Sequence, residues 1–202
     1  MIVVGITGPI AVGKSTVARA LEVCGAALFD ADAEVWAYYQ GEGLEAVSAL
    51  FPQARVQGRI DRARLSASAL ADPQALRRLE ELVHPVVAAR RRTFLTAARA
   101  RGARMAALEI PLLVETGGER FVDVVLLADA PEAIRRERAM ARPGMNAQKL
   151  AAIVARQADD AERRRRAHFV IDTGGAIEST RAQAMDLFRA LAGSEKEKPG
   201  DA

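Results

Sequence analysis

The fold is decided at the N-terminus by the stretch GITGPIAVGKSTVARAL, residues 5–21, which continues the apolar run MIVVGIT, residues 1–7. Four residues of the stretch fit the pattern G-x-x-x-x-G-K-[ST]: Gly8, Gly13, Lys14 and Ser15. The apolar run predicts a buried strand, and the residues after the pattern have helical spacing up to Gly25. Glycines between a strand and a helix let backbone N–H groups and the positive helix end converge. The stretch therefore predicts an anion site for nucleotide phosphates.

Two side chains of this stretch predict its chemistry. Lys14 is expected to reach the β- and γ-phosphates of ATP, and Ser15 is expected to place its hydroxyl on Mg²⁺. Lys14 is also the first lysine of the chain, and the next is Lys149. An isolated lysine in an arginine-rich chain points to a specific role for that side chain.

The rest of the chain alternates strand patterns with helical patterns. Four further strands are predicted from AALFDAD (26–32), ARMAALEIPLL (103–113), FVDVVLLADAP (121–131) and HFVIDTGG (168–175). A closing helix is predicted from AIESTRAQAMDLFRALAG. This order is typical of an α/β fold with a parallel sheet, here of five strands flanked by helices.

The chain is predicted to form one domain over residues 1–192, with two additions to its core. The core comprises residues 1–32, 103–130 and 167–192. Residues 33–102 are mostly helical and too long for a simple crossover, so they predict an inserted helical subdomain, with a loop at FPQARVQGRIDRARL. Residues 131–166 are arginine-rich and predict a lid. The charged segment 193–202 is predicted to be disordered.

Composition narrows the functional class. The chain has 202 residues, and no apolar run reaches the roughly 18 residues of a membrane span. Without an export signal and with a single cysteine, Cys24, a cytoplasmic protein without a membrane partner is expected. The net charge is only +3 and aromatic residues make up 4%, which argues against nucleic acid as a partner. A monomer is favoured.

The second predicted strand ends in the acidic pair of FDAD, residues 29–32. Ligands of α/β folds lie at the carboxyl ends of strands, and residues two apart on a strand point the same way. Asp32 is therefore the preferred base to accept the proton of an acceptor hydroxyl. For Asp30, a place beside it in the site and a helix-capping role both stay open.

Several motifs in this order resemble the dephospho-CoA kinase family. They are GITGPIAVGKST, FDADAEVW, LEELVHPVV and LEIPLLVET, followed by RAMARPGMN, ARQ and HFVIDTGG, and together they cover Met1 to Leu191. The resemblance implies transfer of the γ-phosphate of ATP to the 3′-hydroxyl of dephospho-CoA. It also implies a P-loop fold similar to the nucleoside monophosphate kinases, with a parallel core sheet, a helical substrate domain and a mobile lid.

The resemblance also implies the site residues, matched motif by motif. For ATP it implies Ala11, Val12, Gly13, Lys14, Ser15 and Thr16, with Ser15 as the Mg²⁺ ligand. For the acceptor it implies Asp32, His84, Glu109, Pro111, Leu112 and Arg138. For catalysis it implies Lys14, Asp32 and the lid residue Arg142.

The chain departs from the family pattern at five positions. Pro9, Ala11 and Val12 stand where glycine, glycine and serine are common. Glu109 stands in place of the usual aspartate, and Thr173 in place of a frequent asparagine. The loop is therefore expected to be stiffer and less polar than in its relatives.

Other candidates keep two interpretations. His84 precedes Pro85, which is expected to kink or end its helix, so His84 is either a packed or capping residue or, by the resemblance, part of the acceptor site. The run of three arginines at 90–92 either meets the pyrophosphate of the acceptor or forms a solvated face. The arginine run at 163–166 is expected to be mostly solvated.

The lid arginines have a helical spacing. Arg135, Arg138 and Arg142 recur at intervals of three and four, which predicts a basic stripe on one helix. Such guanidinium groups would stabilise the charge of a transferred phosphoryl group.

Two other functions stay open from the residues alone. One is a kinase for a different small hydroxyl or nucleotide acceptor, and the other is a P-loop switch or nucleic-acid-associated ATPase. The chain contains no N-K-x-D motif of the kind that reads guanine, which disfavours a GTP switch.

Overall fold

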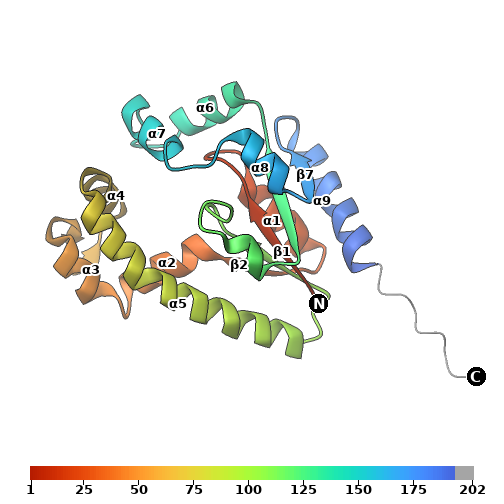
Figure 1. Ribbon diagram of the computed structural model, residues 1–202, viewed down its shortest axis with the longest axis horizontal. Coiled ribbons are helices and arrows are strands. Elements are labelled where there is room, and N and C mark those ends of the chain that lie inside the picture. The colour runs from red at the N-terminus through yellow and green to blue at the C-terminus, as the bar shows by residue number, and fades with distance from the viewer. Residues whose placement is uncertain (194–202) are drawn as a thin grey trace, which may run out of the picture. The chain divides into compact units, whose positions relative to one another are not determined.

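The computed structural model describes residues 1–193, so the predicted tail lies outside the described residues apart from Gly193. The chain forms two compact units. The core unit contains Met1–Phe29 and the chain from Leu95 onward, and the helical unit contains Asp30–Phe94. Figure 1 shows the elements of both units in chain order.

The core unit is built on one five-stranded sheet, and its strand order is β2-β5-β1-β6-β7. Its strands are β1 (Ile2–Thr7), β2 (Ala27–Asp30), β5 (Met105–Glu109), β6 (Val124–Asp129) and β7 (Phe169–Asp172). Strand β1 lies at the centre and pairs in parallel with β5 and β6, with Val4 opposite Ala107 and Gly5 opposite Val125. Strand β6 pairs in parallel with β7. The predicted five-stranded parallel sheet is confirmed.

Two helices of the core unit share a large apolar cluster with this sheet. The helices of the core unit are α1 (Lys14–Val23), α6 (Glu132–Met140), α7 (Ala147–Val154), α8 (Asp160–Arg166) and α9 (Ile177–Ala192), with a 3-10 turn at Gly118–Phe121. The cluster joins Ile6 of β1 and Leu126 of β6 to Leu21 of α1 and Leu187 of α9. Burial of these side chains supplies the main driving force for the unit, at about 1.5–3 kcal/mol for each large one.

The helical unit has a core of its own. Its elements are α2 (Ala31–Gln40), α3 (Leu44–Leu50), a 3-10 turn at Pro52–Ala54, β3 (Arg55–Val56), β4 (Arg59–Ile60), α4 (Arg62–Ala71) and the first part of α5 (Pro73–Ala100). Tyr38, Val47, Phe51 and Leu79 are buried together in this unit. It therefore has the apolar interior of a separate compact body.

The loop predicted around Gln57 is instead a short antiparallel hairpin of β3 and β4. Gln57 and Gly58 both have positive φ, 48° and 77°, as the two central residues of a type I′ turn require. Glutamine is an unusual first residue for such a turn, where asparagine or aspartate is usual. The prediction missed the hairpin because its strands are only two residues long.

Helix α5 runs without interruption through Pro85. The expectation that the helix ends at His84 is wrong, and His84 therefore caps no helix. Proline removes one backbone hydrogen bond of a helix. Apolar residues on both sides of it, Val83 and Val86 among them, pack into the core of the helical unit and hold the helix together.

The segment 131–166 contains three short helices, and the prediction of a single basic stripe is wrong. Helix α6 ends at Met140, so Arg142 lies beyond it in a turn. Pro143 follows, and Gly144 has φ 71°, which breaks the helical path before Asn146 caps α7. Among residues 1–193, no helix is long and apolar enough to cross a membrane.

The central strand requires a glycine at position 5. A Cβ atom there would lie 2.7 Å from Leu113 Cδ2 and 3.0 Å from Val122 Cγ1, and the Leu113 side chain is fully buried and cannot withdraw. We expect Gly5→Ala to lower the free energy of unfolding by about 1–3 kcal/mol, measured by urea denaturation. Gly175→Ala is the matched control, because a Cβ at Gly175 meets no atom within 4 Å. Equal stability of the two variants would contradict the packing described.

Candidate active site

The phosphate loop, residues 8–15, turns sharply between β1 and α1. Gly8 has φ 147°, and a Cβ there would lie 2.5 Å from the carbonyl oxygen of Ala128. Gly13 has φ 102° and stands just before the first residue of α1, Lys14. Both glycines of the sequence pattern are therefore required by the backbone. Ala11 has a positive φ of 59° although it is not glycine, a conformation that costs about 1 kcal/mol.

Val12 fixes the middle of the loop. Its side chain is fully buried in the apolar cluster of the core unit. Its carbonyl oxygen lies 2.5 Å from Thr173 Oγ1 and accepts a longer hydrogen bond, 3.5 Å, from Arg138 Nη1. Thr173 Oγ1 is also 2.8 Å from the carbonyl oxygen of Asp129, and its single hydrogen serves one acceptor at a time.

Thr173 is a site residue that the sequence presented only as a departure from the family pattern. Its side chain is buried directly beneath the loop, and a Cβ on Gly13 would lie 3.5 Å from Thr173 Cβ. The position after the last strand therefore supports the loop backbone. The sequence feature that could have identified Thr173 is a hydroxyl residue followed by two glycines at the end of a strand.

The Lys14 side chain lies back over its own loop. Its Nζ donates to the carbonyl oxygens of Gly8, at 2.9 Å, and Pro9, at 3.2 Å. An ammonium group at this place lies against the loop that the pattern assigns to phosphate. Its charge thus lies at the loop that the sequence predicts to bind phosphate.

Ser15 and Glu109 meet at the end of β5. Ser15 Oγ donates to Glu109 Oε1 at 2.7 Å, and the Glu109 side chain is buried although it is acidic. Glu109 is the last residue of β5, and Ile6 of β1 lies opposite it. Two of the sequence-predicted residues, 94 positions apart, are therefore in direct contact.

Pro111 and Leu112 follow β5 and are half-buried. Thr7 Oγ1, at the end of β1, donates to the carbonyl oxygen of Pro111 at 3.3 Å. The predicted acceptor motif after β5 thus lies beside the strand that leads into the phosphate loop.

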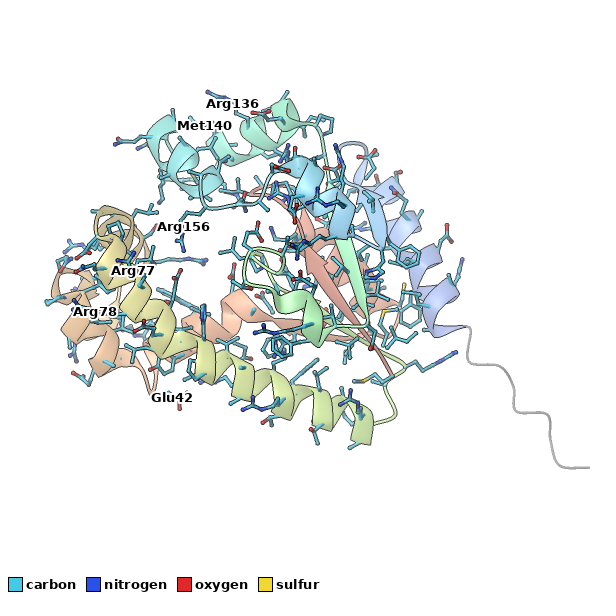
Figure 2. All side chains as sticks on the ribbon, in the orientation of Figure 1. Glu42, Arg77, Arg78, Arg136, Met140 and Arg156 are labelled. Carbon is cyan, nitrogen blue, oxygen red and sulfur yellow. The ribbon has the colours of Figure 1, made fainter. Side chains whose placement is uncertain are left out.

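The predicted arginines have different environments. Arg138 contacts the loop at Val12, whereas Arg142 is exposed in the turn after α6. Arg135 is bound to Asp160 by two hydrogen bonds, 2.5 Å and 3.2 Å long. Figure 2 shows the exposed side chains of Arg136 and Met140 on α6 and of Arg156 after α7.

Arg163 does not fit the expectation of a mostly solvated arginine run. Its side chain is 4% exposed and contacts Asp160 at 2.7 Å and Glu115 at 3.4 Å. The next residue, Arg164, is exposed and pairs with Asp129. Asp160 is three residues earlier on the same helix, but Glu115 lies 48 positions away, so the helical pattern alone did not predict that Arg163 is buried.

Within the helical unit, the two acids of FDAD have separate roles. Asp30 caps α2, and its Oδ1 accepts from the backbone N–H of Ala33 at 2.9 Å. Asp32 is exposed in the first turn of α2 and does not lie on a strand. The argument that both carboxylates share one side of a strand is therefore wrong, and the capping interpretation of Asp30 is confirmed.

His84 and Arg90 lie on α5. His84 is exposed, so it is not a packed core residue. Arg90 donates to Glu34 at 2.9 Å and to Glu42 at 2.8 Å, and joins α5 to α2 and the turn after it. These ion pairs distinguish Arg90 from a solvated face, and its contact with the acceptor pyrophosphate stays a prediction.

Comparison with known proteins shows to which family this chain belongs. The model of the dephospho-CoA kinase family matches residues 2–179. The chain belongs to the dephospho-CoA kinase family. A dephospho-CoA kinase from Rhodopseudomonas palustris is 44% identical over 98% of this chain and 100% of its own length.

Two solved structures extend the likeness to the fold. A Thermus thermophilus protein has a TM-score of 0.77 and 37% identity, covering 94% of this chain and 97% of its own. The dephospho-CoA kinase from Campylobacter jejuni has a TM-score of 0.64 at 21% identity, covering 94% of this chain and 96% of its own. At that identity the second likeness concerns the fold alone.

The negative charge of Asp32 contributes to a raised pKa of the neighbouring residue Tyr39. Burial, with the carboxylates of Glu80 and Asp32 and the phenol of Tyr38, raises the pKa of Tyr39 to about 12. We expect Asp32→Asn to lower this pKa, because one of the charges opposing the phenolate is lost.

Phenolate absorbance followed against pH tests this expectation. The chain has two tyrosines, so the titration is done in a Tyr38→Phe background, with circular dichroism to confirm that the protein stays folded. Glu80→Gln is the matched variant and should shift the Tyr39 pKa in the same direction. If the Tyr39 pKa is the same in Asp32→Asn as in the parent protein, the Asp32 carboxylate does not act on Tyr39, which contradicts the expectation.

Proposed function

We propose that the chain transfers the γ-phosphoryl group of MgATP to the 3′-hydroxyl of dephospho-CoA, with coenzyme A and ADP as products. Membership of the dephospho-CoA kinase family supports ATP-dependent phosphorylation of dephospho-CoA. The observation that carries the proposal is the phosphate loop, in which Lys14 lies against the loop carbonyls and Ser15 contacts Glu109.

The loop supplies the donor half of the reaction. Its backbone N–H groups and the start of α1 form a concave site for phosphate oxygens. Lys14 would exchange the carbonyl oxygens of Gly8 and Pro9 for the β- and γ-phosphate oxygens, and its charge would stabilise the transition state. The main-chain part of the site is already shaped by Val12 and Thr173.

Ser15 and Glu109 suit Mg²⁺. A hydroxyl and a buried carboxylate 2.7 Å apart offer the oxygen ligands that this ion prefers. Bound by these two residues, Mg²⁺ would offset the negative charge of the phosphate groups. Glu109 is one methylene longer than the usual aspartate, and its hydrogen bond from Ser15 sets the direction of its carboxylate.

Asp32 would accept the proton of the attacking hydroxyl. Its position in the first turn of α2, after the cap formed by Asp30, gives it a rigid backbone. We assign acceptor binding to the predicted insertion, 33–102, with His84 exposed on α5 as one contact.

Residues 131–166 would act as the lid. Arg138 already contacts the loop, and Arg142, in an exposed turn, would reach the transferred phosphoryl group. Planar guanidinium groups suit this task because they spread their charge over several donors. We further propose that the protein works in the cytoplasm.

An acceptor panel tests the function. Purified protein with MgATP is offered dephospho-CoA, adenosine, AMP or shikimate, and ADP release is followed in a coupled assay. Turnover with dephospho-CoA alone is expected, and Lys14→Ala should abolish it. Turnover with another acceptor and none with dephospho-CoA would overturn the proposal.

Replacement of the base has a specific kinetic signature. We expect Asp32→Asn to lower kcat by about 10²–10⁴-fold, because proton acceptance is lost in the transition state. The affinity for MgATP should stay unchanged, since Asp32 contributes to the acceptor half. Asp30→Asn is the matched control, because asparagine also caps a helix and should retain kcat. A kcat equal to that of the wild type in Asp32→Asn would show that Asp32 is not the base and is only an acid in the first turn of α2.

A further inference from the structure

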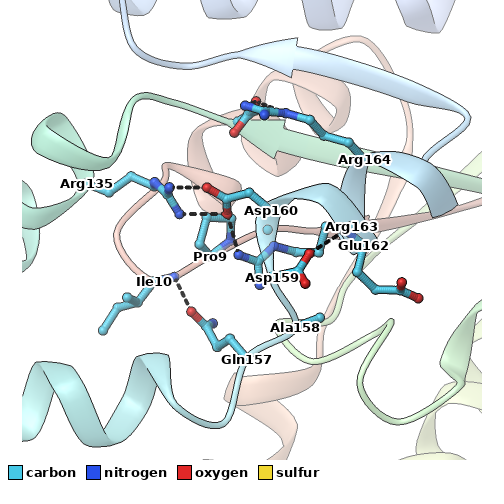
Figure 3. Close-up of polar contacts among 12 residues, drawn as sticks. Pro9, Ile10, Arg135, Gln157, Ala158, Asp159, Asp160, Glu162, Arg163 and Arg164 are labelled. Atoms are coloured by element: carbon cyan, nitrogen blue, oxygen red, sulfur yellow. Dashed lines mark hydrogen bonds and ion pairs between the residues drawn. The ribbon is translucent and has the colours of Figure 1, made fainter.

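One peptide unit of the phosphate loop is held from both of its ends. The carbonyl oxygen of Pro9 accepts from Lys14 Nζ at 3.2 Å. The N–H of the same peptide unit, carried by Ile10, donates to Gln157 Oε1 at 3.1 Å. Figure 3 shows this second contact between the loop and the segment after α7.

We propose that Gln157 is a positioning residue that orients the Pro9–Ile10 peptide, and with it the phosphate-loop backbone against which Lys14 lies before ATP binds. The peptide bond is planar and trans, so its carbonyl and its N–H point in opposite directions. Any rotation of the unit that breaks the bond to Gln157 also turns the Pro9 carbonyl away from Lys14. The inference rests on the proposed function, in which Lys14 binds the ATP phosphates.

Gln157 is itself fixed by its neighbours along the chain. Its own N–H donates to the carbonyl oxygen of Val154, which closes the end of α7. The next N–H, of Ala158, donates to Glu115 Oε1 at 2.8 Å. Glu115 lies in the segment that follows β5, so the turn that carries Gln157 is tied to the sheet.

A buried ion cluster strengthens this tie. Arg163 bridges Glu115 and Asp160, and Arg135 of α6 binds the other side of Asp160. Figure 3 shows Asp160 between the two guanidinium groups. Burial alone would raise the pKa of Asp160, but Arg135 and Arg163 lower it below its ordinary value. Asp160 is therefore held in its charged form, and its contacts with Arg135 and Arg163 join α6 to α8.

Besides the long hydrogen bond from Arg138 to the Val12 carbonyl, the loop meets the lid through apolar side chains. Ile10 and Ala11 pack with Ala139 and Leu150 of α6 and α7. Ile10 and Gln157 also line a cavity of about 470 Å³ between the loop and these helices. Apolar contacts allow sliding, whereas the hydrogen bond from Ile10 to Gln157 is directional. Gln157 thus supplies the orientation that packing alone leaves open.

The test replaces the side chain that accepts the Ile10 hydrogen bond and measures the kinetic constants for both substrates. Leucine has a similar size but cannot accept the Ile10 N–H. In Gln157→Leu we expect kcat/KM for ATP to fall about tenfold, the factor for losing one directed hydrogen bond that orders the loop. KM for dephospho-CoA should change by less than about twofold, because the acceptor half is untouched. An equal loss for both substrates would overturn the proposal.

A direct readout of the loop accompanies the kinetics. The amide proton of Ile10, observed by NMR, should move upfield and exchange faster in Gln157→Leu. Gln157→Glu keeps an acceptor oxygen and should keep the exchange protection of the wild type. An Ile10 amide that is the same in all three proteins would show that the hydrogen bond does not orient the loop.

Asn146→Ala is the matched control for general loosening of the lid. It removes another side-chain acceptor of a backbone N–H, that of Lys149, at the start of α7. It should leave the Ile10 amide unchanged, and a shift as large as in Gln157→Leu would overturn the specific role of Gln157.

Calorimetric titration with MgADP separates this inference from the proposed function, because it needs no acceptor. Weaker MgADP binding in Gln157→Leu supports the inference even if the acceptor were another molecule, and unchanged binding contradicts it.

Discussion

Burial of Val12 in the middle of the phosphate loop is the constraint on which the site depends. The side chain has no exposed surface and belongs to the same apolar cluster as Ile6 and Leu126 of the sheet. The loop proposed to bind phosphate through its backbone is thereby anchored to the core by an apolar side chain. The carbonyl of Val12 then has a fixed position, where Thr173 and Arg138 can reach it. In relatives where serine is common at this position, a polar side chain stands where this chain has an apolar one.

In the proposed function, the two compact units have different tasks. The core unit holds the residues proposed to bind MgATP, and β1, α1 and β5 place Lys14, Ser15 and Glu109 there. The helical unit carries the proposed base, Asp32, on a helix with its own cap and its own apolar core. Each half is thus rigid through its internal packing. Membership of the dephospho-CoA kinase family gives these two halves a donor and an acceptor of known chemistry.

The sequence predicted those features that depend on local patterns. The glycine loop and the parallel sheet follow from a strand, a turn and a helix in succession, whereas phosphate binding by Lys14 and Mg²⁺ binding by Ser15 stay predictions. The features that were missed depend on contacts between distant residues. Ile10 and Gln157 are 147 positions apart, and Arg163 and Glu115 are 48 apart, so no periodicity signals either contact. Asp32 was placed on a strand because FDAD continues an apolar run, although the cap formed by Asp30 starts the helix two residues earlier.

The most direct test of the buried anchor is the affinity of Val12→Ser for MgADP, measured by titration calorimetry against the wild type. Serine restores the residue common in the family but puts a hydroxyl in an apolar site and removes two methyl groups from the core. If Val12 anchors the loop, the variant should bind MgADP about tenfold more weakly while it remains folded. Binding as tight as in the wild type, or tighter, would contradict the account and assign this position to direct phosphate contact.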